Sequence, residues 1–356
     1  MATDPVFPLL EAGGHEAILL STEPAAGYRG VIALHSTVLG PAVGGTRVWP
    51  YATESEAVVD SLRLSRGMTL KNAMAGIPFG GGKSVIIADP RSMDRDAVFR
   101  AHGRAIHRLG GRYITGEDVG STVADMELIA SETPYVGGRG GGSGDPSPYT
   151  ARGVFRAMQA GARAVWGTED LAGRKVAVQG CGNVGAHLAK LLADAGAELT
   201  VCDLDAARAA RVADETGARF VPVEGIYDAP ADIFAPCALG QILNEETIPR
   251  LKGRLVSGGA NNQLRTPRDG DALLARGITY VPDYVANAGG VLSGAGDFLG
   301  WPSDRVRGKI EGIFETTLEV LECARQEGLP PGEVADRIAW KKIDDARQGV
   351  GPSDRP

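Results

Sequence analysis

The stretch KVAVQGCGNVG, residues 175–185, decides the fold of the second half of the chain. Its β-rich start leads directly into Gly180, Gly182 and Gly185, and helical AHLAKLLADAG and β-rich ELTVCD follow, the last ending at Asp203. A strand, a glycine turn, a helix and a second strand with a terminal acidic residue form the complete dinucleotide-binding fingerprint. The pattern predicts a Rossmann-type, doubly wound α/β domain.

Each position of this fingerprint has a physical role. Gly182 lets the backbone approach a pyrophosphate, whose charge faces the helix N-terminus, and Gly185 permits close packing of the helix on the strand. Asp203 is expected to accept hydrogen bonds from an adenosine ribose and to repel a 2′-phosphate, and no arginine follows it before Arg208. These features favour NAD over NADP as the cofactor. The alternative is a Rossmann domain that has lost its ligand.

Strands and helices continue to alternate after the fingerprint. The segments RFVPV, DIFAPCAL, RLVSGGA and ITYVPD are typical of further strands in one sheet. Two amide-bearing runs, ANNQL at residues 260–264 and VANAGGV at residues 285–291, each come after a strand. An open α/β sheet binds its ligand at the carboxyl ends of its strands, so we expect both runs to lie near that ligand.

The first half of the chain contains the segment MTLKNAMAGIPFGGGK, residues 68–83, which places Lys71 and Lys83 among apolar residues. Burial and a second ammonium group nearby both disfavour the charged form of a lysine, and a neutral lysine can act as a general base. Glycines 80–82 are expected to leave room for a ligand to approach the backbone, since glycine has no side chain and tolerates positive φ.

Two other interpretations of this segment were weighed. GGGKS suggests a phosphate-binding loop, but that motif requires a glycine where this chain has Ile77. In the second interpretation both lysines are solvated surface residues and the glycines form a turn.

The remaining segments of the first half are typical of an α/β domain. Residues 17–20 and 30–35 are β-rich and predict a hairpin, and Thr53 with Glu56 forms a capping-box pattern that starts a helix. Asp118 follows the β-rich segment RYIT, at a position where loops commonly carry functional groups. A helix cap or a turn is the alternative role for this aspartate.

A glycine-rich segment divides the chain. Residues 137–148, GGRGGGSGDPSP, have the composition of a linker. We therefore expect a substrate-binding, catalytic-lysine domain over residues 1–136 and the dinucleotide-binding domain over residues 149–329. The C-terminal helix, within residues 330–356, is expected to pack back on the first domain.

The overall composition limits the possible classes of function. The net charge of −7 argues against nucleic acid or an anionic membrane as a partner and favours a small-molecule ligand. The sequence has neither the run of about 20 apolar residues that a membrane span needs nor a signal peptide, so we expect a cytoplasmic protein. The four cysteines lack zinc-type spacing, and we expect neither a disulfide nor a metal site.

Seven motifs occur in one order: GPAVGGTR, MTLKNAMAGIPFGGGK, ITGEDVG, GCGNVG, DIFAPCALG, ANNQL and NAGGV. With them the chain resembles the glutamate/leucine/phenylalanine/valine dehydrogenases over roughly residues 15–345, and most of all their leucine and valine branches. The resemblance implies an N-terminal α/β domain for substrate binding and oligomerisation beside the Rossmann-type NAD-binding domain. It also implies a homo-oligomer and NAD(P)-dependent oxidative deamination of an L-amino acid to a 2-oxo acid and ammonia.

The resemblance further implies roles for individual residues. Lys71 corresponds to the lysine that binds the substrate α-carboxylate, Lys83 to the catalytic lysine, and Asp118 to the aspartate that handles protons at the amine. The amides around Gly44 and Gly45 are expected to bind the same carboxylate. The other expected contacts are Asn262, with substrate and nicotinamide, and, with the cofactor, Thr150, Gly180, Gly182, Asn183, Val184, Gly185, Asp203, Ala238 and Asn261.

The resemblance implies an apolar substrate side chain. Glutamate dehydrogenases have a lysine for the side-chain carboxylate where this chain has Val43. At the pocket positions leucine-type enzymes typically have Leu, Ala, Val and Val, and this chain has Val43, Gly116, Val291 and Gly294. The pocket is therefore expected to be larger, although Phe298 could refill part of it. We expect a leucine-like substrate, with phenylalanine-type specificity or a non-catalytic NAD-binding homologue as the alternatives.

Overall fold

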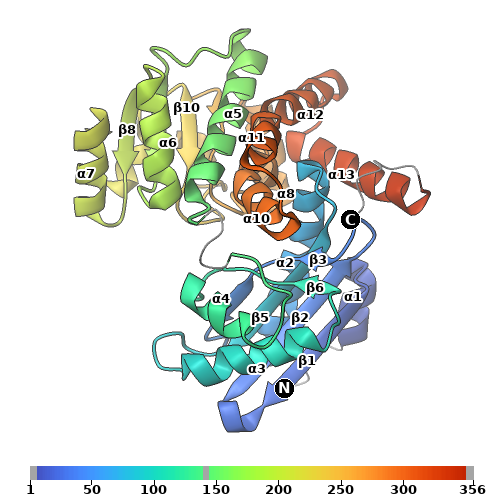
Figure 1. Ribbon diagram of the computed structural model, residues 1–356. Coiled ribbons are helices and arrows are strands. Elements are labelled where there is room, and N and C mark those ends of the chain that lie inside the picture. Colours follow the sequence, from blue (N-terminus) through green and yellow to red (C-terminus); the bar gives the residue numbers. More distant parts are fainter. Residues whose placement is uncertain (1–5, 139–143, 350–356) are drawn as a thin grey trace. The chain divides into compact units, whose positions relative to one another are not determined.

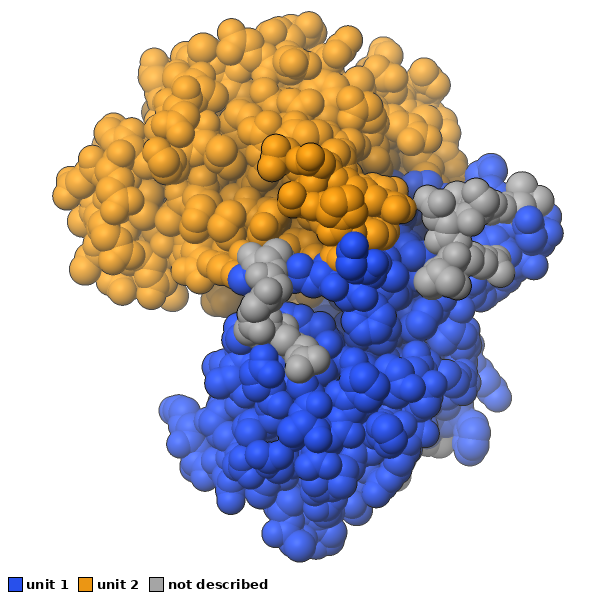
Figure 2. Space-filling view, in the orientation of Figure 1, with its two compact units in different colours: residues 1–144, 297–300, 339–356 blue, residues 145–296, 301–338 orange. Residues whose placement is uncertain are grey.

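The computed structural model describes residues 6–138 and 144–349. The chain divides into unit 1, which comprises Met1–Gly144, Asp297–Gly300 and Ala339–Pro356, and unit 2, which comprises Asp145–Gly296 and Trp301–Ile338 (Figure 2). Each unit has its own sheet and helices, which confirms the predicted two-domain α/β fold. Residues 139–143 of the predicted linker lie outside the described residues, and the linker's last residues belong to a helix that begins at Ser147.

Unit 1 contains a mixed six-stranded sheet. Its elements are α1 (Val6–Gly13), β1 (Ala17–Glu23), η1 (Pro24–Ala26), β2 (Tyr28–Ser36), β3 (Ala42–Val43), β4 (Thr46–Trp49), α2 (Glu54–Ala75), β5 (Gly80–Ile87), α3 (Arg95–His107), β6 (Tyr113–Ile114) and α4 (Val123–Ala130). The strand order is β1-β2-β5-β3-β6, and β4 also pairs with β5. The antiparallel pair β1 and β2 confirms the predicted hairpin, and Thr53 caps α2 by accepting a hydrogen bond from the Glu56 amide.

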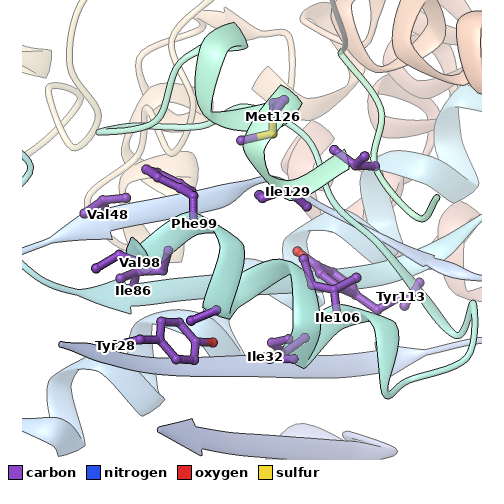
Figure 3. Close-up of a cluster of buried hydrophobic side chains, with 14 of the residues drawn as sticks. Tyr28, Ile32, Val48, Ile86, Val98, Phe99, Ile106, Tyr113, Met126 and Ile129 are labelled. Atoms are coloured by element: carbon purple, nitrogen blue, oxygen red, sulfur yellow. The ribbon is translucent and has the colours of Figure 1, made fainter. Parts of the chain in front are cut away.

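The two faces of this sheet carry different helices (Figure 1). On one face, Ile86 of β5 packs with Phe99 of α3 in a cluster that also includes α4 (Figure 3). On the other face, Val85 packs with Leu62 of α2. Successive side chains of a strand point to opposite faces, so Lys83 shares the α2 face with Val85.

Glycines 80–82 lie within β5, the strand at the centre of this sheet. A Cβ atom on Gly81 would lie 2.1 Å from Oγ1 of Thr69 in α2, and one on Gly82 would lie 2.7 Å from Cδ2 of Tyr113. None of the three has positive φ. The expectation that they leave room for a ligand is therefore wrong, because neighbouring protein atoms fill the space that their missing side chains leave.

A buried polar cluster lies on the α3 face of the same sheet. His102 of α3 has its Nδ1 atom 2.8 Å from the Tyr28 hydroxyl and its Nε2 atom 3.1 and 3.0 Å from the hydroxyls of Thr46 and Ser84. Tyr113 donates a hydrogen bond to the Ser84 hydroxyl. Burial lowers the pKa of His102 to about 3, so this imidazole stays neutral at physiological pH.

Unit 2 contains a parallel six-stranded sheet. Its elements are α5 (Ser147–Trp166), β7 (Lys175–Gln179), α6 (Asn183–Asp194), β8 (Glu198–Cys202), α7 (Ala206–Thr216), β9 (Arg219–Phe220), η2 (Val223–Asp228), β10 (Ile233–Pro236), η3 (Ile248–Arg250), β11 (Leu255–Val256), α8 (Pro267–Ala275), β12 (Thr279–Tyr280), α9 (Asp283–Ala286), α11 (Ser303–Glu311) and α12 (Ile313–Glu327). Helices α10 (Gly289–Leu299) and α13 (Pro331–Arg347) each continue into residues grouped with unit 1.

The strand order of unit 2 is β12-β11-β10-β7-β8-β9, and every pairing is parallel. Read from β9, this is the Rossmann order, in which the first strand lies beside the fourth. The order reverses between β7 and β10, and open α/β sheets bind their ligands at such a switch point. The doubly wound fold predicted from the glycine fingerprint is confirmed.

Three further properties concern the described residues as a whole. None of their helices combines the length and the apolar character needed to span a bilayer. All four cysteines are unpaired thiols. Within residues 6–138 and 144–349, no three His, Cys, Asp or Glu side chains are grouped so that they could hold a metal ion.

We predict opposite effects for two glycine substitutions in unit 1. Gly81→Ala should lower the free energy of unfolding by roughly 1–3 kcal/mol, because the new methyl group forces α2 away from β5. The matched control is Gly67→Ala in the middle of α2, where an added Cβ atom meets nothing within 4 Å. This substitution should raise the free energy of unfolding by about 0.5–1 kcal/mol. Urea denaturation followed by circular dichroism measures both free energies. Equal stability of the two variants would contradict the close packing of α2 against β5 at Gly81.

Candidate active site

A buried ion pair forms the centre of the site in unit 1. Lys83 is only 5% exposed, and its Nζ atom lies 3.0 Å from Oδ2 of Asp118 in the loop after β6. Helix α4 is capped by Thr122, so the helix-cap alternative for Asp118 is wrong. The solvated-surface alternative for Lys83 is also wrong, because strand β5 holds it on the covered face of the sheet.

Arg47 and Asp60 extend this ion pair into a chain of alternating charges. Arg47, on β4, donates from Nε to Oδ2 of Asp118 at 3.1 Å and from Nη1 to Oδ2 of Asp60 at 2.9 Å. Asp60, on α2, also accepts a hydrogen bond from the Tyr51 hydroxyl at 2.6 Å. The sequence interpretation included Arg47 in the motif GPAVGGTR but assigned it no role, since a pairing between β4 and the loop after β6 has no local pattern.

The environment shifts the ionisation of both members of the central pair. Burial lowers the pKa of Lys83, Asp118 partly offsets this effect, and the Arg47 cation lowers the pKa further. Burial raises the pKa of Asp118, but the charges of Lys83 and Arg47 outweigh burial and leave its pKa below the usual value. A lysine with a lowered pKa beside an ionised carboxylate suits general acid–base chemistry.

Of the expected carboxylate-binding residues, Gly45 lies against Asp118. Lys71 is partly buried near the end of α2. A Cβ atom on Gly45 would lie 2.9 Å from Cβ of Asp118, so only glycine fits there. The Gly44 amide donates to the Ile114 carbonyl at 3.2 Å, whereas the Gly45 amide has no hydrogen-bond partner among the described residues. Of the two amides, that of Gly45 is therefore the one open to a ligand.

The fingerprint glycines in unit 2 have three different environments. Gly180 has a φ of 100°, which a tight turn after β7 requires. A Cβ atom on Gly185 would lie 1.9 Å from the Gly180 carbonyl oxygen, so helix α6 packs closely on the turn. At Gly182, the N-cap of α6, an added Cβ atom would meet nothing within 4 Å. This open position at a helix N-terminus fits a pyrophosphate.

The carboxylate of Asp203 is fixed at the end of β8. It accepts hydrogen bonds from the Cys181 amide at 2.7 Å and the Asp205 amide at 2.8 Å. Arg208 reaches it as well, with Nη1 3.5 Å from Oδ1. The sequence interpretation took Arg208 to be too far along the chain from Asp203 to matter for cofactor choice. The first turn of α7 nevertheless brings its guanidinium group back to this carboxylate.

Among the other predicted cofactor residues of unit 2, Ala238 lies against the fingerprint. A Cβ atom on Gly180 would lie 2.8 Å from Cβ of Ala238, and one on Gly259 would lie 2.7 Å from Cγ1 of Val184. Asn183 is exposed in the first turn of α6. The Thr150 hydroxyl, on α5, donates to the Pro146 carbonyl at 3.0 Å, and an added Cβ atom on Gly290 would meet that hydroxyl at 2.6 Å.

The two asparagines of ANNQL are held by residues that the sequence interpretation did not single out. Asn262 and Gln241 have φ values of 51° and 61°, and the Gln241 amide donates to the Asn262 carbonyl at 2.6 Å. Asn287 donates from Nδ2 to Oδ1 of Asn261 at 2.8 Å. The motif NAGGV contains Asn287 but does not show that this residue binds Asn261. The positive φ of Gln241 has no signal in the sequence.

The four expected pocket positions are divided between the units. Val43 and Gly116 belong to unit 1, and Val291 and Gly294 belong to unit 2. A Cβ atom on Gly116 would have its nearest neighbour at 3.9 Å, and one on Gly294 would meet nothing within 4 Å. Phe298 lies with unit 1, where its ring centroid is 5.9 Å from that of Phe79 in an edge-to-face arrangement.

Comparison with known proteins agrees with this geometry. Residues 17–135 match the model of the Glu/Leu/Phe/Val dehydrogenase dimerisation domain, and residues 141–207 and 203–351 match that of Glutamate/Leucine/Phenylalanine/Valine dehydrogenase. The chain is 49% identical to leucine dehydrogenase from Thermoactinomyces intermedius, over 96% of this chain and 94% of that enzyme. It is 47% identical to valine dehydrogenase from Streptomyces virginiae, over 95% and 96%.

A solved structure shows the same likeness. The L-tryptophan dehydrogenase from Nostoc punctiforme superposes with a TM-score of 0.85 at 40% identity, over 96% of this chain and all of that chain. The fold, the site and these relatives define an oxidoreductase of the amino acid dehydrogenase class that uses a nicotinamide cofactor. The chain belongs to the glutamate/leucine/phenylalanine/valine dehydrogenase family, and the resemblance found in its motifs is confirmed.

Two fingerprint substitutions should separate cofactor binding from stability. Gly182→Ala should melt at the wild-type temperature, because its extended backbone and open surroundings accept a methyl group. The methyl group occupies the space that a dinucleotide needs, so we expect affinity to fall by about tenfold, or about 1.4 kcal/mol. Gly185→Ala should instead lower the melting temperature. Fluorescence titration with the reduced dinucleotide and thermal melting measure the two effects, and unchanged affinity in Gly182→Ala would contradict the assignment.

Proposed function

We propose that the protein catalyses the NAD-dependent oxidative deamination of an apolar L-amino acid to the 2-oxo acid and ammonia, and the reverse reductive amination. The observation that carries this proposal is the buried pair of Lys83 and Asp118. A non-catalytic, NAD-binding homologue would have no use for a buried ammonium group, which is costly to maintain. Family membership supports the same reaction class.

The proposed mechanism assigns a step to each member of the pair. A nicotinamide dinucleotide held at Gly182 and Asp203 would supply the redox chemistry, as the acceptor of hydride from the substrate Cα. Lys83, in its neutral form, takes a proton from a water molecule as that water attacks the resulting imine carbon. Asp118 relays the proton that Lys83 has taken up to the amine of the resulting carbinolamine. The carbinolamine hydroxyl then returns a proton to Lys83 as the C–N bond breaks, which forms the 2-oxo acid and releases ammonia. The low pKa of Lys83 is what makes its neutral form accessible.

Substrate orientation is assigned to groups beside the pair. Lys71 and the open amide of Gly45 bind the α-carboxylate, since a cation and an N–H donor are the natural partners of a carboxylate. Asn262 contributes its side-chain amide to the substrate and the nicotinamide. Its positive φ is a conformation that few residues other than glycine adopt and that is often found at functional sites.

NAD is the proposed cofactor. The open N-terminus of α6 at Gly182 suits the pyrophosphate, and Asp203 suits the ribose hydroxyls because a carboxylate repels a 2′-phosphate. Arg208 does not reverse this preference, since its guanidinium group lies beside Asp203 and Asp205. The remaining contacts are assigned to Thr150, Gly180, Asn183, Val184, Gly185, Ala238 and Asn261.

The proposed substrate carries a bulky apolar side chain. Val43 offers no charge to a polar side chain, and Gly116 and Gly294 are smaller than the Ala and Val that leucine-type enzymes typically have at these positions. Each buried CH₂ group contributes about 0.8 kcal/mol, so a small side chain that leaves space unfilled binds less well. Similarity to a tryptophan dehydrogenase supports tolerance of aromatic side chains.

The domain roles and the assembly complete the proposal. Residues 1–136 bind the substrate and carry the catalytic lysine, and residues 149–329 bind the dinucleotide. The match of residues 17–135 to a dimerisation domain supports a homo-oligomer. A cytoplasmic location stays a prediction from the sequence.

A substrate panel tests the proposed function directly. We expect formation of reduced cofactor, followed at 340 nm, with leucine, methionine and phenylalanine. NAD should give a higher kcat/KM than NADP. Valine should give a lower kcat/KM than leucine or phenylalanine, because it leaves pocket volume unfilled. A higher value for valine would refute the enlarged pocket, and no activity with any L-amino acid would refute the proposed reaction.

The ionisation of Lys83 predicts the pH dependence. Only the neutral amine accepts a proton, so deamination should increase with pH and level off above the pKa of Lys83, which lies below 10.5. Lys83→Ala should lower kcat by at least about a hundredfold, the contribution of one general base, while NAD binding is unchanged. A pH profile that stays flat under conditions where chemistry limits the rate would contradict this role.

A further inference from the structure

Arg47 contacts both carboxylates of the site in unit 1, yet the proposed mechanism gives it no step. Its Nε atom lies 3.1 Å from Oδ2 of Asp118, and the Nζ atom of Lys83 lies 3.0 Å from the same oxygen. Both cations therefore share one carboxylate oxygen. Because both contacts are made to Oδ2, Oδ1 of Asp118 is the carboxylate oxygen that neither cation holds.

Arg47 is itself fixed at its far end. Its Nη1 atom donates to Oδ2 of Asp60 at 2.9 Å. That carboxylate is held by the Tyr51 hydroxyl at 2.6 Å and by Arg63, which donates to the other oxygen at 2.8 Å. The side chains of Arg47 and Asp60 are only 22% and 17% exposed. A fixed, largely buried arginine that bridges two carboxylates differs from a solvated surface ion pair, which contributes little.

We propose that Arg47 is a positioning residue for the proposed deamination, on which this inference rests. By holding Oδ2 of Asp118 it turns Oδ1 toward the substrate amine. Together with Asp60 it sets the balance of charge that Lys83 faces. Arg47 acts only through these neighbours and takes no part in bond making or breaking.

The charged groups with the largest effects on the pKa of Lys83 are Asp118 from the loop after β6, Arg47 from β4 and Asp60 from α2. Besides burial, which has the largest effect, Asp118 and Asp60 raise the pKa of Lys83 and Arg47 lowers it. Neutralising Arg47 should therefore move the alkaline limb of the activity profile to higher pH. Neutralising Asp60 should move it to lower pH. A merely structural role would not produce shifts of opposite sign.

The test compares the wild type with Arg47→Met, Asp60→Asn and the matched control Arg63→Met. Arg63 pairs with Asp60 from the half-exposed side and makes no contact with Asp118. We expect Arg47→Met to lower kcat about tenfold, since one charge-assisted hydrogen bond is lost, and to shift the limb upward. Asp60→Asn should shift it downward, and Arg63→Met should leave it unchanged. Leucine and NAD serve as substrates, and thermal melting checks folding.

A second readout does not depend on turnover. Acetic anhydride reacts with neutral amines, so peptide mass spectrometry of acetylated Lys83 across a pH series reports its ionisation in each variant. If the wild type shows no amino acid dehydrogenase activity, the proposed function fails, and the acetylation profiles still decide whether Arg47 and Asp60 act on Lys83 in opposite directions.

Two results would overturn the inference. One is a wild-type kcat and a wild-type Lys83 profile in folded Arg47→Met. The other is a shift of the same sign in Arg47→Met and Asp60→Asn. If Arg47→Met does not fold, Arg47→Lys replaces it, because it keeps the charge but loses the Nε–H donor. We expect Arg47→Lys to have a lowered kcat with an unshifted limb, and a wild-type kcat would refute the positioning role.

Discussion

A lysine ammonium group loses most of its hydration when it is buried, and unit 1 is arranged around that constraint. Lys83 is paired with Asp118, Asp118 with Arg47, and Arg47 with Asp60, so that each of these four charges has an opposite neighbour. Removing one member of such a buried chain leaves its partner uncompensated, which costs more than the lost contact alone. The positions of β4, β5, α2 and the loop after β6 are therefore mutually dependent.

Glycines serve two different purposes in this protein. Gly81 and Gly185 allow protein elements to pack closely, and an added Cβ atom at either position would overlap a backbone or side-chain atom of a neighbour. Gly182 faces open space and fits a ligand. The two kinds cannot be distinguished by residue type, and their surroundings alone show which positions maintain the fold and which are available for binding.

Much of the architecture and the central residues could be predicted from the sequence. The fingerprint has a short-range pattern and gave the Rossmann unit, and the apolar context of Lys83 indicated its burial. Long-range contacts had no such signal. The pairing of Arg47 with Asp118 depends on strand register, and glycines 80–82 resembled a ligand loop although they form a strand. The effect of Arg47 on the pKa of Lys83 had no sequence signal either, because the two residues lie on different strands, far apart along the chain.

Strand β5 separates two kinds of polar chemistry by a single peptide unit. Lys83 points to one face, where the proposed mechanism changes its charge, and Ser84 points to the other, where it contacts the neutral His102. The His102 imidazole takes up a proton only in a strongly acidic medium. The hydroxyl groups around it therefore keep one hydrogen-bonding pattern while Lys83 gains and loses its proton. Proton transfer at Lys83 on one face of the sheet therefore leaves the hydrogen bonds of the supporting residues on the other face unchanged.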